Sequence, residues 1–219
     1  MTNATTTPRL VAFDLDDTLA ASKSPLDPRM ATLIVDLLGA VEVCVISGGN
    51  FAQFELQLVD NLPLDHPDAL ARLHLMPTCG TQYFLFQEGG WAAEDRGSQI
   101  TFSALGQAAP VDAKKAWDPS GDKKNALRAA VQELLPELEV RSGGSTSVDI
   151  TRRGIDKAYG MRKLAELTGI PLDDMLFVGD RLDPDGNDYP VKAMGVECIA
   201  VEGWEDTAAF IEKFLAARR

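Results

Sequence analysis

Three carboxylates lie close together in the sequence, directly after a short apolar run. Asp14, Asp16 and Asp17 follow residues 10–13, Leu-Val-Ala-Phe. Side chains alternate along an extended chain, so Asp14 and Asp16 point to the same side, where their like charges repel. A single aspartate at such a place is more often a turn or helix-capping residue. The density of carboxylates here instead favours a site for a hard, oxygen-preferring cation such as Mg²⁺.

Two further apolar runs also end in polar residues. Ser47 and Gly48 follow residues 41–46, and Asp180 comes shortly after residues 175–178. In an open parallel sheet, ligands bind outside the carboxyl ends of the strands. If these runs are neighbouring strands, Asp180 completes an oxygen-rich site with Asp14. His66 and His74 are the only histidines, and neither has a spacing with cysteine or histidine that suits zinc, so Mg²⁺ is the expected cofactor.

The order of elements predicts an α/β fold with a Rossmann-like parallel sheet. Apolar runs alternate with segments of helical periodicity at both ends of the chain, which is the pattern of strand, turn and helix in such folds. We expect strands at 10–13, 41–46, 175–178 and 198–201, and helices at 30–38, 51–58, 156–168 and 205–217.

The middle of the chain has a different texture. Residues 82–153 contain Gly- and Thr-rich stretches typical of antiparallel strands, interrupted by one helical segment at 122–135. We therefore expect a core made of residues 1–81 and 154–219, with residues 82–153 as an inserted α+β domain that contains an antiparallel sheet.

Composition excludes several classes of protein. The 219 residues include 21 Lys and Arg against 33 Asp and Glu, giving a net charge of −12, which argues against nucleic acid or an anionic membrane as the main partner. The three widely spaced cysteines, a polar N-terminus and the lack of a long apolar run predict a cytoplasmic protein with reduced thiols. No pattern predicts the oligomeric state.

The residues from Phe13 to Leu19, read as Phe-Asp-Leu-Asp-Asp-Thr-Leu, resemble the first motif of the haloacid dehalogenase superfamily. The other three motifs of that superfamily follow in order. Ser47 resembles the second, Lys157 the third, and Gly179-Asp180 with Gly186-Asn187-Asp188 the fourth. Asp17 stands where glycine is common in the superfamily, so its side chain is expected to face solvent or to cap the following segment.

The resemblance implies a role for each of these residues. Asp14 would be the nucleophile that forms an aspartyl-phosphate, and Asp16 the general acid and base. Lys157 would brace Asp14 and the phosphate, which Ser47 and the Gly48 amide would also bind. Mg²⁺ would be held by Asp14, by the main-chain oxygen of Asp16 and by Asp180. Asn187 and Asp188 would orient the metal, with Asp185 a weaker candidate.

The position of the insertion resembles the type-two cap of the superfamily, in its IIB subgroup. Residues 143–149, Gly-Gly-Ser-Thr-Ser-Val-Asp, are similar to those of phosphomannomutases and sugar-phosphate phosphatases, which implies that Ser147 and Asp149 face the substrate. An exposed β-ribbon would have the same alternating pattern, so this reading stays open. The first half of the insertion departs from the mutases, because Ser-Ala-Leu-Gly-Gln at 103–107 lacks their arginine.

Three functions are compatible with this pattern. The leading one is a Mg²⁺-dependent phosphatase that hydrolyses a small phosphorylated metabolite, such as a sugar phosphate. The alternative is a phosphosugar mutase, which must also grip a distal phosphate and so calls for arginines in the insertion, where Arg128 and Arg141 could serve. A binding protein without turnover is the third, and the intact Asp14, Asp16, Lys157 and Asp180 argue against it.

Overall fold

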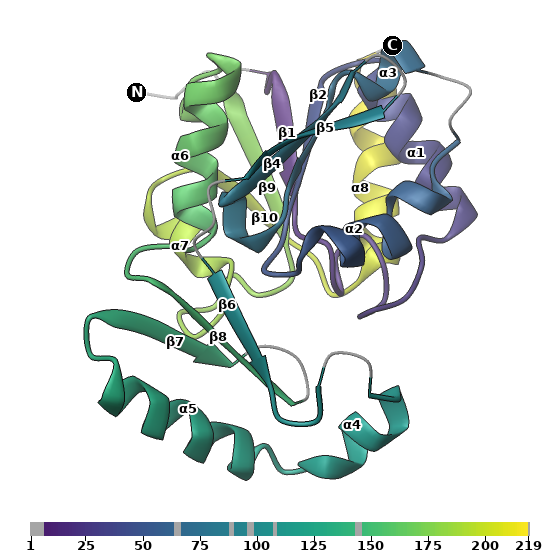
Figure 1. The fold of residues 1–219 in the computed structure, drawn as a ribbon. Helices are drawn as coiled ribbons and strands as arrows, with labels where there is room; N and C mark the ends of the chain where they lie inside the picture. Colours follow the sequence, from purple (N-terminus) through teal and green to yellow (C-terminus); the bar gives the residue numbers. More distant parts are fainter. Residues whose placement is uncertain are drawn as a thin grey trace. The chain divides into compact units, whose positions relative to one another are not determined.

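The computed structural model describes residues 7–63, 67–87, 90–95, 99–106, 109–142 and 146–218. The chain divides into two compact units. The larger is made of Met1–Asp95 and Asp156–Arg219, and the smaller of Arg96–Ile155. Each is described by itself below (Figure 1).

The larger unit is built on a seven-stranded sheet with the order β10-β9-β1-β2-β3-β4-β5. The first five strands of that order are parallel, and β4 and β5 continue the sheet in antiparallel pairing. The strands are β1 (Leu10–Phe13), β2 (Glu42–Ile46), β3 (Leu73–Met76), β4 (Gln82–Gln87), β5 (Gly90–Asp95), β9 (Met175–Gly179) and β10 (Glu197–Ala200). The two strands that flank β1 are therefore β2 and β9, as the predicted convergence of their polar ends requires.

Helices cover both faces of this sheet, with α1, α2 and α8 on one side and α6 and α7 on the other (Figure 1). Their bounds are α1 (Pro28–Leu38), α2 (Phe51–Gln57), α3 (Pro67–Leu70), α6 (Lys157–Thr168), α7 (Tyr189–Ala193) and α8 (Trp204–Ala216). Val11 and Phe13 belong to the core that contains α1, whereas Leu10 and Ala12 belong to the core that contains α6. By this alternation, the next even-numbered residue, Asp14, continues the α6 side of the sheet.

Local sequence accounts for the ends of the main helices. Pro28 occupies the first turn of α1, the side chain of Asp27 accepts a hydrogen bond from the Arg29 amide, and Gly39 follows the last residue. In α6, Asp156 is the N-cap, and its side chain accepts from the Tyr159 amide at 2.9 Å. This cap places Lys157 in the first turn of α6, at the carboxyl edge of the sheet.

The smaller unit contains a three-stranded antiparallel sheet in the order β6-β8-β7, together with α4 (Val111–Trp117) and α5 (Asp122–Leu134). Its strands are β6 (Gln99–Ser103), β7 (Leu138–Ser142) and β8 (Ser147–Arg152). Val140 and Val148 are buried on the face that packs against α5. The register pairs Arg141 with Asp149, so these two side chains share the opposite, polar face.

The fold class is as predicted, a mostly parallel α/β sheet with a separate antiparallel sheet, but the first boundary of the insertion differs. Residues 82–95 were expected in the insertion and instead form β4 and β5 of the larger sheet. An antiparallel hairpin has the same local pattern in either unit, and only its pairing with β3 assigns it to the core. The second boundary, at 155/156, lies close to the predicted 153/154.

Two expectations about the whole chain can be compared with the described residues. Among them, no helix is both long enough and apolar enough to cross a membrane. Cys44 is buried, Cys79 and Cys198 are half-buried, and the structure joins none of the three in a disulfide.

Candidate active site

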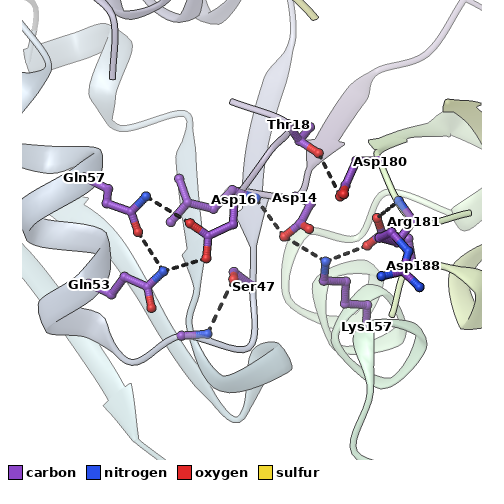
Figure 2. Close-up of polar contacts among 12 residues, drawn as sticks. Asp14, Asp16, Thr18, Ser47, Gln53, Gln57, Lys157, Asp180, Arg181 and Asp188 are labelled. Atoms are coloured by element: carbon purple, nitrogen blue, oxygen red, sulfur yellow. Dashed lines mark hydrogen bonds and ion pairs between the residues drawn. The ribbon is translucent and has the colours of Figure 1, made fainter. Parts of the chain in front are cut away.

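Asp14 and Lys157 form a buried ion pair at the carboxyl edge of the sheet (Figure 2). The amide of Asp14 donates to the Val178 carbonyl at 3.0 Å, so pairing with β9 continues one residue past β1. Asp14 Oδ1 accepts from the Leu15 amide at 2.7 Å and lies 2.7 Å from Lys157 Nζ. Only 1% of the Lys157 side chain is exposed, so this charge is held within the site and not in solvent.

Asp188 is the second partner of Lys157. Its Oδ1 lies 2.5 Å from Lys157 Nζ, and its Oδ2 accepts from the Arg181 amide at 3.0 Å. A side chain on Gly179 would collide with this carboxylate, because an added Cβ would lie 2.4 Å from Asp188 Oδ2. Glycine at position 179 therefore lets the fourth motif close around Asp188, which is fully buried.

For Asp14 and Lys157, burial and the charge of the ion-pair partner shift the pKa in opposite directions. Burial raises the pKa of Asp14 to about 7, although Lys157 opposes the shift. Burial alone would lower the pKa of Lys157, but Asp14 and Asp188 outweigh it, so the pKa lies above its usual value and the lysine stays charged. Burial and the nearby Asp188 also raise the pKa of Asp180.

Asp14, Asp180 and Asp188 each offer an oxygen atom to a common centre, and these atoms lie within 4.8 Å of one another. Three carboxylates around one lysine leave an excess of negative charge, and an all-oxygen donor set suits a hard cation such as Mg²⁺. The described residues therefore fit a divalent cation. Asp188, expected to orient the metal, belongs to this group together with the two carboxylates expected to bind it.

Asp16 lies beside Asp14 but contacts different residues (Figure 2). Its Oδ1 accepts from the Lys23 amide at 2.8 Å and from Gln57 Nε2 at 3.1 Å. Its Oδ2 accepts from Gln53 Nε2 at 2.9 Å. The two glutamines are on α2 and were not identified from the sequence, where helical glutamines usually indicate a solvated surface.

The turn after β2 carries Ser47 and Gly48, the two residues that were expected to bind phosphate. Ser47 is buried, and its Oγ accepts from the Gly49 amide at 3.4 Å. An added Cβ on Gly48 would meet nothing within 4 Å, so the space beside this residue is open. A backbone amide with open space next to it can donate to an incoming phosphate oxygen.

A second turn, Thr78–Gly80, braces the Ser47 turn and was not predicted from the sequence. All three residues have positive φ, at 49°, 54° and 84°. The Thr78 amide donates to the Gly49 carbonyl at 2.8 Å, and the Cys79 amide donates to the Ser47 carbonyl at 2.9 Å. For the β-branched Thr78 this conformation is strained, and such strain persists only where the surrounding structure holds it.

The remaining predicted residues lie outside this cluster. Asn187 and Asp185 are exposed in the turn before α7, and the Asp185 amide donates to Asp183 Oδ1 at 3.1 Å, as expected of a turn residue. Asp17 is exposed with a φ of 56°, and its Oδ1 accepts from the Ser22 amide, so both expectations for it hold. The left-handed φ explains why glycine is favoured at this position.

The residues expected to contact substrate from the insertion lie in the smaller unit. Ser147 and Asp149 are half-buried on the polar face of β8. Arg141, on the same face, donates from Nε and Nη2 to Glu139 Oε1. Gln107, which stands near the missing arginine, and residues 143–145 of the Gly-Gly-Ser stretch lie outside the described residues.

Comparison with known proteins agrees with the motifs. The family model for haloacid dehalogenase-like hydrolases matches residues 113–190. A probable phosphomannomutase of Caenorhabditis elegans is 24% identical over 262 aligned positions, covering 98% of each chain. Human phosphomannomutase 1 is 22% identical, covering 84% of this chain and 83% of its own.

Solved structures with the same fold are more distant in sequence. A haloacid dehalogenase-like hydrolase from Bacteroides thetaiotaomicron has a TM-score of 0.67 at 14% identity, covering 94% of this chain and 99% of its own. An IMP-bound IMP-nucleotidase of Plasmodium falciparum has a TM-score of 0.65 at 12% identity, covering 96% of this chain and 68% of its own. By its ordered motifs, the family model matched over residues 113–190 and its fold, the chain is similar to haloacid dehalogenase-like hydrolases and, in sequence, to phosphomannomutases.

Proposed function

We propose that the protein is a Mg²⁺-dependent phosphotransferase that forms an aspartyl-phosphate on Asp14 and hydrolyses a small sugar phosphate. The observation that carries this proposal is the buried contact of Asp14 with Lys157, at the sheet edge where the Ser47 turn and Asp180 also lie. An anionic nucleophile can approach an anionic phosphate only where positive charge offsets the repulsion. Lys157 supplies that charge from inside the protein.

The two oxygens of Asp14 are not equivalent. Oδ1 is engaged by Lys157 and by the Leu15 amide, whereas no hydrogen bond to Oδ2 is found among the described residues. We assign Oδ2 as the attacking atom. Its bond to phosphorus forms as the bond from phosphorus to the ester oxygen breaks, and Asp16 gives a proton to that oxygen. Asp16 then takes a proton from the water that releases the phosphate from Asp14.

Asp14, Asp180 and Asp188 are the side chains that would hold Mg²⁺, together with the main-chain oxygen of Asp16. When bound, the ion would supply further positive charge for the phosphoryl group. The protein's own donors act on the same group, because Ser47 and the Gly48 amide can hydrogen-bond its oxygens and Lys157 can neutralise them.

A sugar phosphate is proposed because several relatives are named phosphomannomutases, and the IMP-nucleotidases with the same fold also carry phosphate-ester substrates in their names. The contacts of Arg141 favour hydrolysis over the mutase reaction. Arg141 is the only arginine on the polar face of β6, β7 and β8 in the described residues, and Glu139 already holds its guanidinium at 2.7 Å. A mutase needs a cation there to grip the second phosphate.

The second candidate is a phosphosugar mutase, favoured by the names of those same relatives. It would use the same core residues and differ in the acceptor of the phosphoryl group, which would be the sugar and not water. Breaking the contact between Arg141 and Glu139 would free the guanidinium for that function.

A phosphorus NMR time course separates the two candidates. The protein is incubated with Mg²⁺ and mannose 1-phosphate or glucose 1-phosphate, with and without a catalytic amount of the matching 1,6-bisphosphate. Growth of inorganic phosphate alone supports the phosphatase, and bisphosphate-dependent growth of the 6-phosphate supports the mutase. The Asp14→Asn variant is the control and should give neither product. If these sugars give no product and a wider panel of phosphate esters gives none either, the proposed function is wrong.

A further inference from the structure

The helix after the phosphate-binding turn presents two glutamines to Asp16 (Figure 2). Gln53 and Gln57 are four residues apart on α2, a spacing that places both side chains on one face of the helix. The N-cap of α2 is Asn50, whose side chain accepts from the Gln53 amide at 3.1 Å. The helix is thus anchored next to the Ser47 turn, and its inner face is turned toward the first motif.

The three side chains form a closed ring of hydrogen bonds. Gln53 Nε2 donates to Asp16 Oδ2 at 2.9 Å and to Gln57 Oε1 at 2.6 Å. Gln57 Nε2 donates to Asp16 Oδ1 at 3.1 Å and to the Ser24 carbonyl at 3.0 Å. An amide group has two N–H donors, so each glutamine uses both. Each oxygen of Asp16 thus receives one amide donor from the pair.

The surroundings leave the ring one arrangement. Gln57 is fully buried, and its Nε2 donates to Asp16 Oδ1 and to the Ser24 carbonyl, which has no proton to donate in return. Turning the amide around would set its oxygen against the Ser24 carbonyl, and a buried polar group without a partner is costly. Gln53 Oε1 lies close to the Gly49 backbone, where a Cβ would be only 2.3 Å away, so glycine at position 49 leaves room for this side chain.

The ring also connects two segments that must act together. Gln57 holds the loop after the first motif through the Ser24 carbonyl, and its own carbonyl accepts from the Leu26 amide at 2.8 Å. On the other side, Gln53 lies in the first turn of α2, which directly follows the phosphate-binding turn. The position of the Asp16 carboxylate relative to that turn is therefore set by the two glutamines.

We propose that Gln53 and Gln57 are positioning residues that fix the carboxylate of Asp16 for proton transfer to the leaving oxygen. The inference rests on the proposed function, in which Asp16 is the general acid and base. Neither glutamine needs to touch substrate for this role. Without the pair, the carboxylate keeps one hydrogen-bond donor among the described residues, the Lys23 amide, which binds only Oδ1, and Oδ2 can rotate away from the reacting atoms.

The dependence of rate on the leaving group tests this role. An alkyl phosphate expels a poor leaving group and needs a proton from Asp16, whereas p-nitrophenyl phosphate expels a stable phenolate and needs much less help. The value of kcat/KM reports steps up to the first cleavage of the ester bond. For Gln57→Leu we expect kcat/KM for an alkyl phosphate to fall about 10- to 100-fold, and that for p-nitrophenyl phosphate to fall less than about threefold.

Asn61→Ala is the matched control. Asn61 Nδ2 donates to the carbonyls of Leu56 and Gln57, so its loss removes two amide hydrogen bonds to the same helix without touching Asp16. This variant should change the two kcat/KM values equally or not at all. Equal losses on both esters in Gln57→Leu would mean a purely structural role and would overturn the inference. Faster turnover of the alkyl phosphate would overturn it too, because the ring would then hold Asp16 in an unproductive position.

Two further variants keep the test decisive. Gln53→Met changes a half-buried position and removes the single bond to Oδ2, so it serves if Gln57→Leu does not fold, with the same selective loss expected. Asp16→Asn combined with Gln57→Leu should lose no more activity on the alkyl phosphate than Asp16→Asn alone, since residues that act as a unit are not additive. A further tenfold loss in the double variant would contradict the proposal.

Failure of the proposed function is distinguishable from failure of this inference. If the wild-type protein turns over neither ester, the proposed function fails, and the ring is then tested by NMR in the folded, resting protein. The side-chain amide resonances of Gln53 and Gln57 should move in Asp16→Asn relative to the wild type. Unchanged resonances would show that the glutamines do not hold Asp16, and would overturn the inference without any activity measurement.

Discussion

Lys157 is the residue on which the charge balance of the site depends, because it is the buried cation between Asp14 and Asp188. Replacing it by methionine keeps much of its volume but leaves two buried carboxylates unpaired. Breaking a buried ion pair from one side costs about 3–5 kcal/mol, so we expect a loss of that order in the free energy of urea unfolding of Lys157→Met.

The comparison for this prediction is an exposed ion pair. Arg29 Nη2 lies 2.6 Å from Glu212 Oε1 with both side chains about half exposed, so Arg29→Met should cost less than about 1 kcal/mol. Losses of equal size in the two variants would mean that burial of Lys157 does not increase its contribution to the free energy of unfolding. Added Mg²⁺ should restore part of the stability of Lys157→Met, because a cation among the carboxylates offsets their repulsion.

The raised pKa of Asp14 predicts a pH dependence of stability in the protein without divalent cations. The carboxyl keeps its proton up to about pH 7 when folded, whereas in the unfolded chain it loses it near 3.8. The folded state therefore binds more protons between these values, and stability falls as pH rises from about 4 to 7. The fall attributable to Asp14 is at most about 4 kcal/mol.

Thermal and urea unfolding in EDTA across this pH range measure the effect. Asp14→Asn cannot titrate, so its stability should change less with pH than that of the wild type, and it should be the more stable protein at pH 7. A variant with the same pH slope as the wild type would contradict the assignment of the shift to Asp14.

At the scale of elements, the contact of α6 with the Thr78–Gly80 turn holds the site together. An added Cβ on Gly160 would lie 2.2 Å from Ile46 Cδ1 and 2.8 Å from the Cys79 carbonyl oxygen. Replacing a helical glycine by alanine in an open position gains about 1 kcal/mol. Here the collision pushes α6 away from the strand ends, so we expect Gly160→Ala to destabilise the protein by about 1–3 kcal/mol.

The displacement of α6 should also reduce activity, because the same helix carries Lys157 three residues earlier. Unfolding and kcat measurements on Gly160→Ala check both effects. Lys163→Ala on the same helix, which removes only an exposed ion pair with Glu166, is the control and should leave both nearly unchanged. A stabilised Gly160→Ala would contradict the close packing described here.

The elements that could be predicted from sequence are those whose signals are local. The strand of Leu10–Phe13, the helix ended by Gly39 and the helix capped by Asp156 have the expected types and nearly the expected bounds. The strand Leu73–Met76 was not predicted, because four residues with a histidine among them show no clear period. In the structure this histidine, His74, is hydrogen-bonded to Glu42 and Tyr83, and neither of these is a predicted site residue.

In the candidate site, too, the residues that could be predicted are those with local sequence signals. Asp14, Ser47, Lys157 and Asp180 could be proposed from their own motifs, because each lies next to a strand or helix end. Gln53 and Gln57 could not, since their partner Asp16 lies 37 and 41 residues away in the chain. The pairing of β4 with β3 also depends on contacts that the local pattern does not reveal, so residues 82–95 were predicted in the wrong unit.

At the scale of the whole molecule, every residue of the proposed chemistry lies in the larger unit, and none lies in Arg96–Ile155. A variant in which a short Gly-Ser linker replaces residues 96–155 should retain Mg²⁺-dependent hydrolysis of p-nitrophenyl phosphate. It should lose discrimination among sugar phosphates, because Ser147 and Asp149, the residues proposed to face the substrate, lie in the insertion. Relative kcat/KM values across a sugar-phosphate panel test this, with Asp14→Asn in the same shortened chain as the blank.

A shortened protein that folds, shown by cooperative unfolding, but has no activity on the aryl ester would mean that the insertion supplies a catalytic group. A shortened protein with unchanged sugar selectivity would mean that the core, not the insertion, recognises the sugar. The second result would move the specificity residues away from Ser147 and Asp149.

The central claim is that Asp14 carries the phosphoryl group during turnover, and it can be tested directly. The protein is mixed with Mg²⁺ and its best phosphate ester, quenched in acid within one turnover, digested and analysed by mass spectrometry. We expect a phosphorylated peptide whose modified residue is Asp14, and none in the Asp14→Asn variant. Turnover in the wild type with no phosphoryl group on Asp14, or with the group on another residue, would contradict the proposed mechanism.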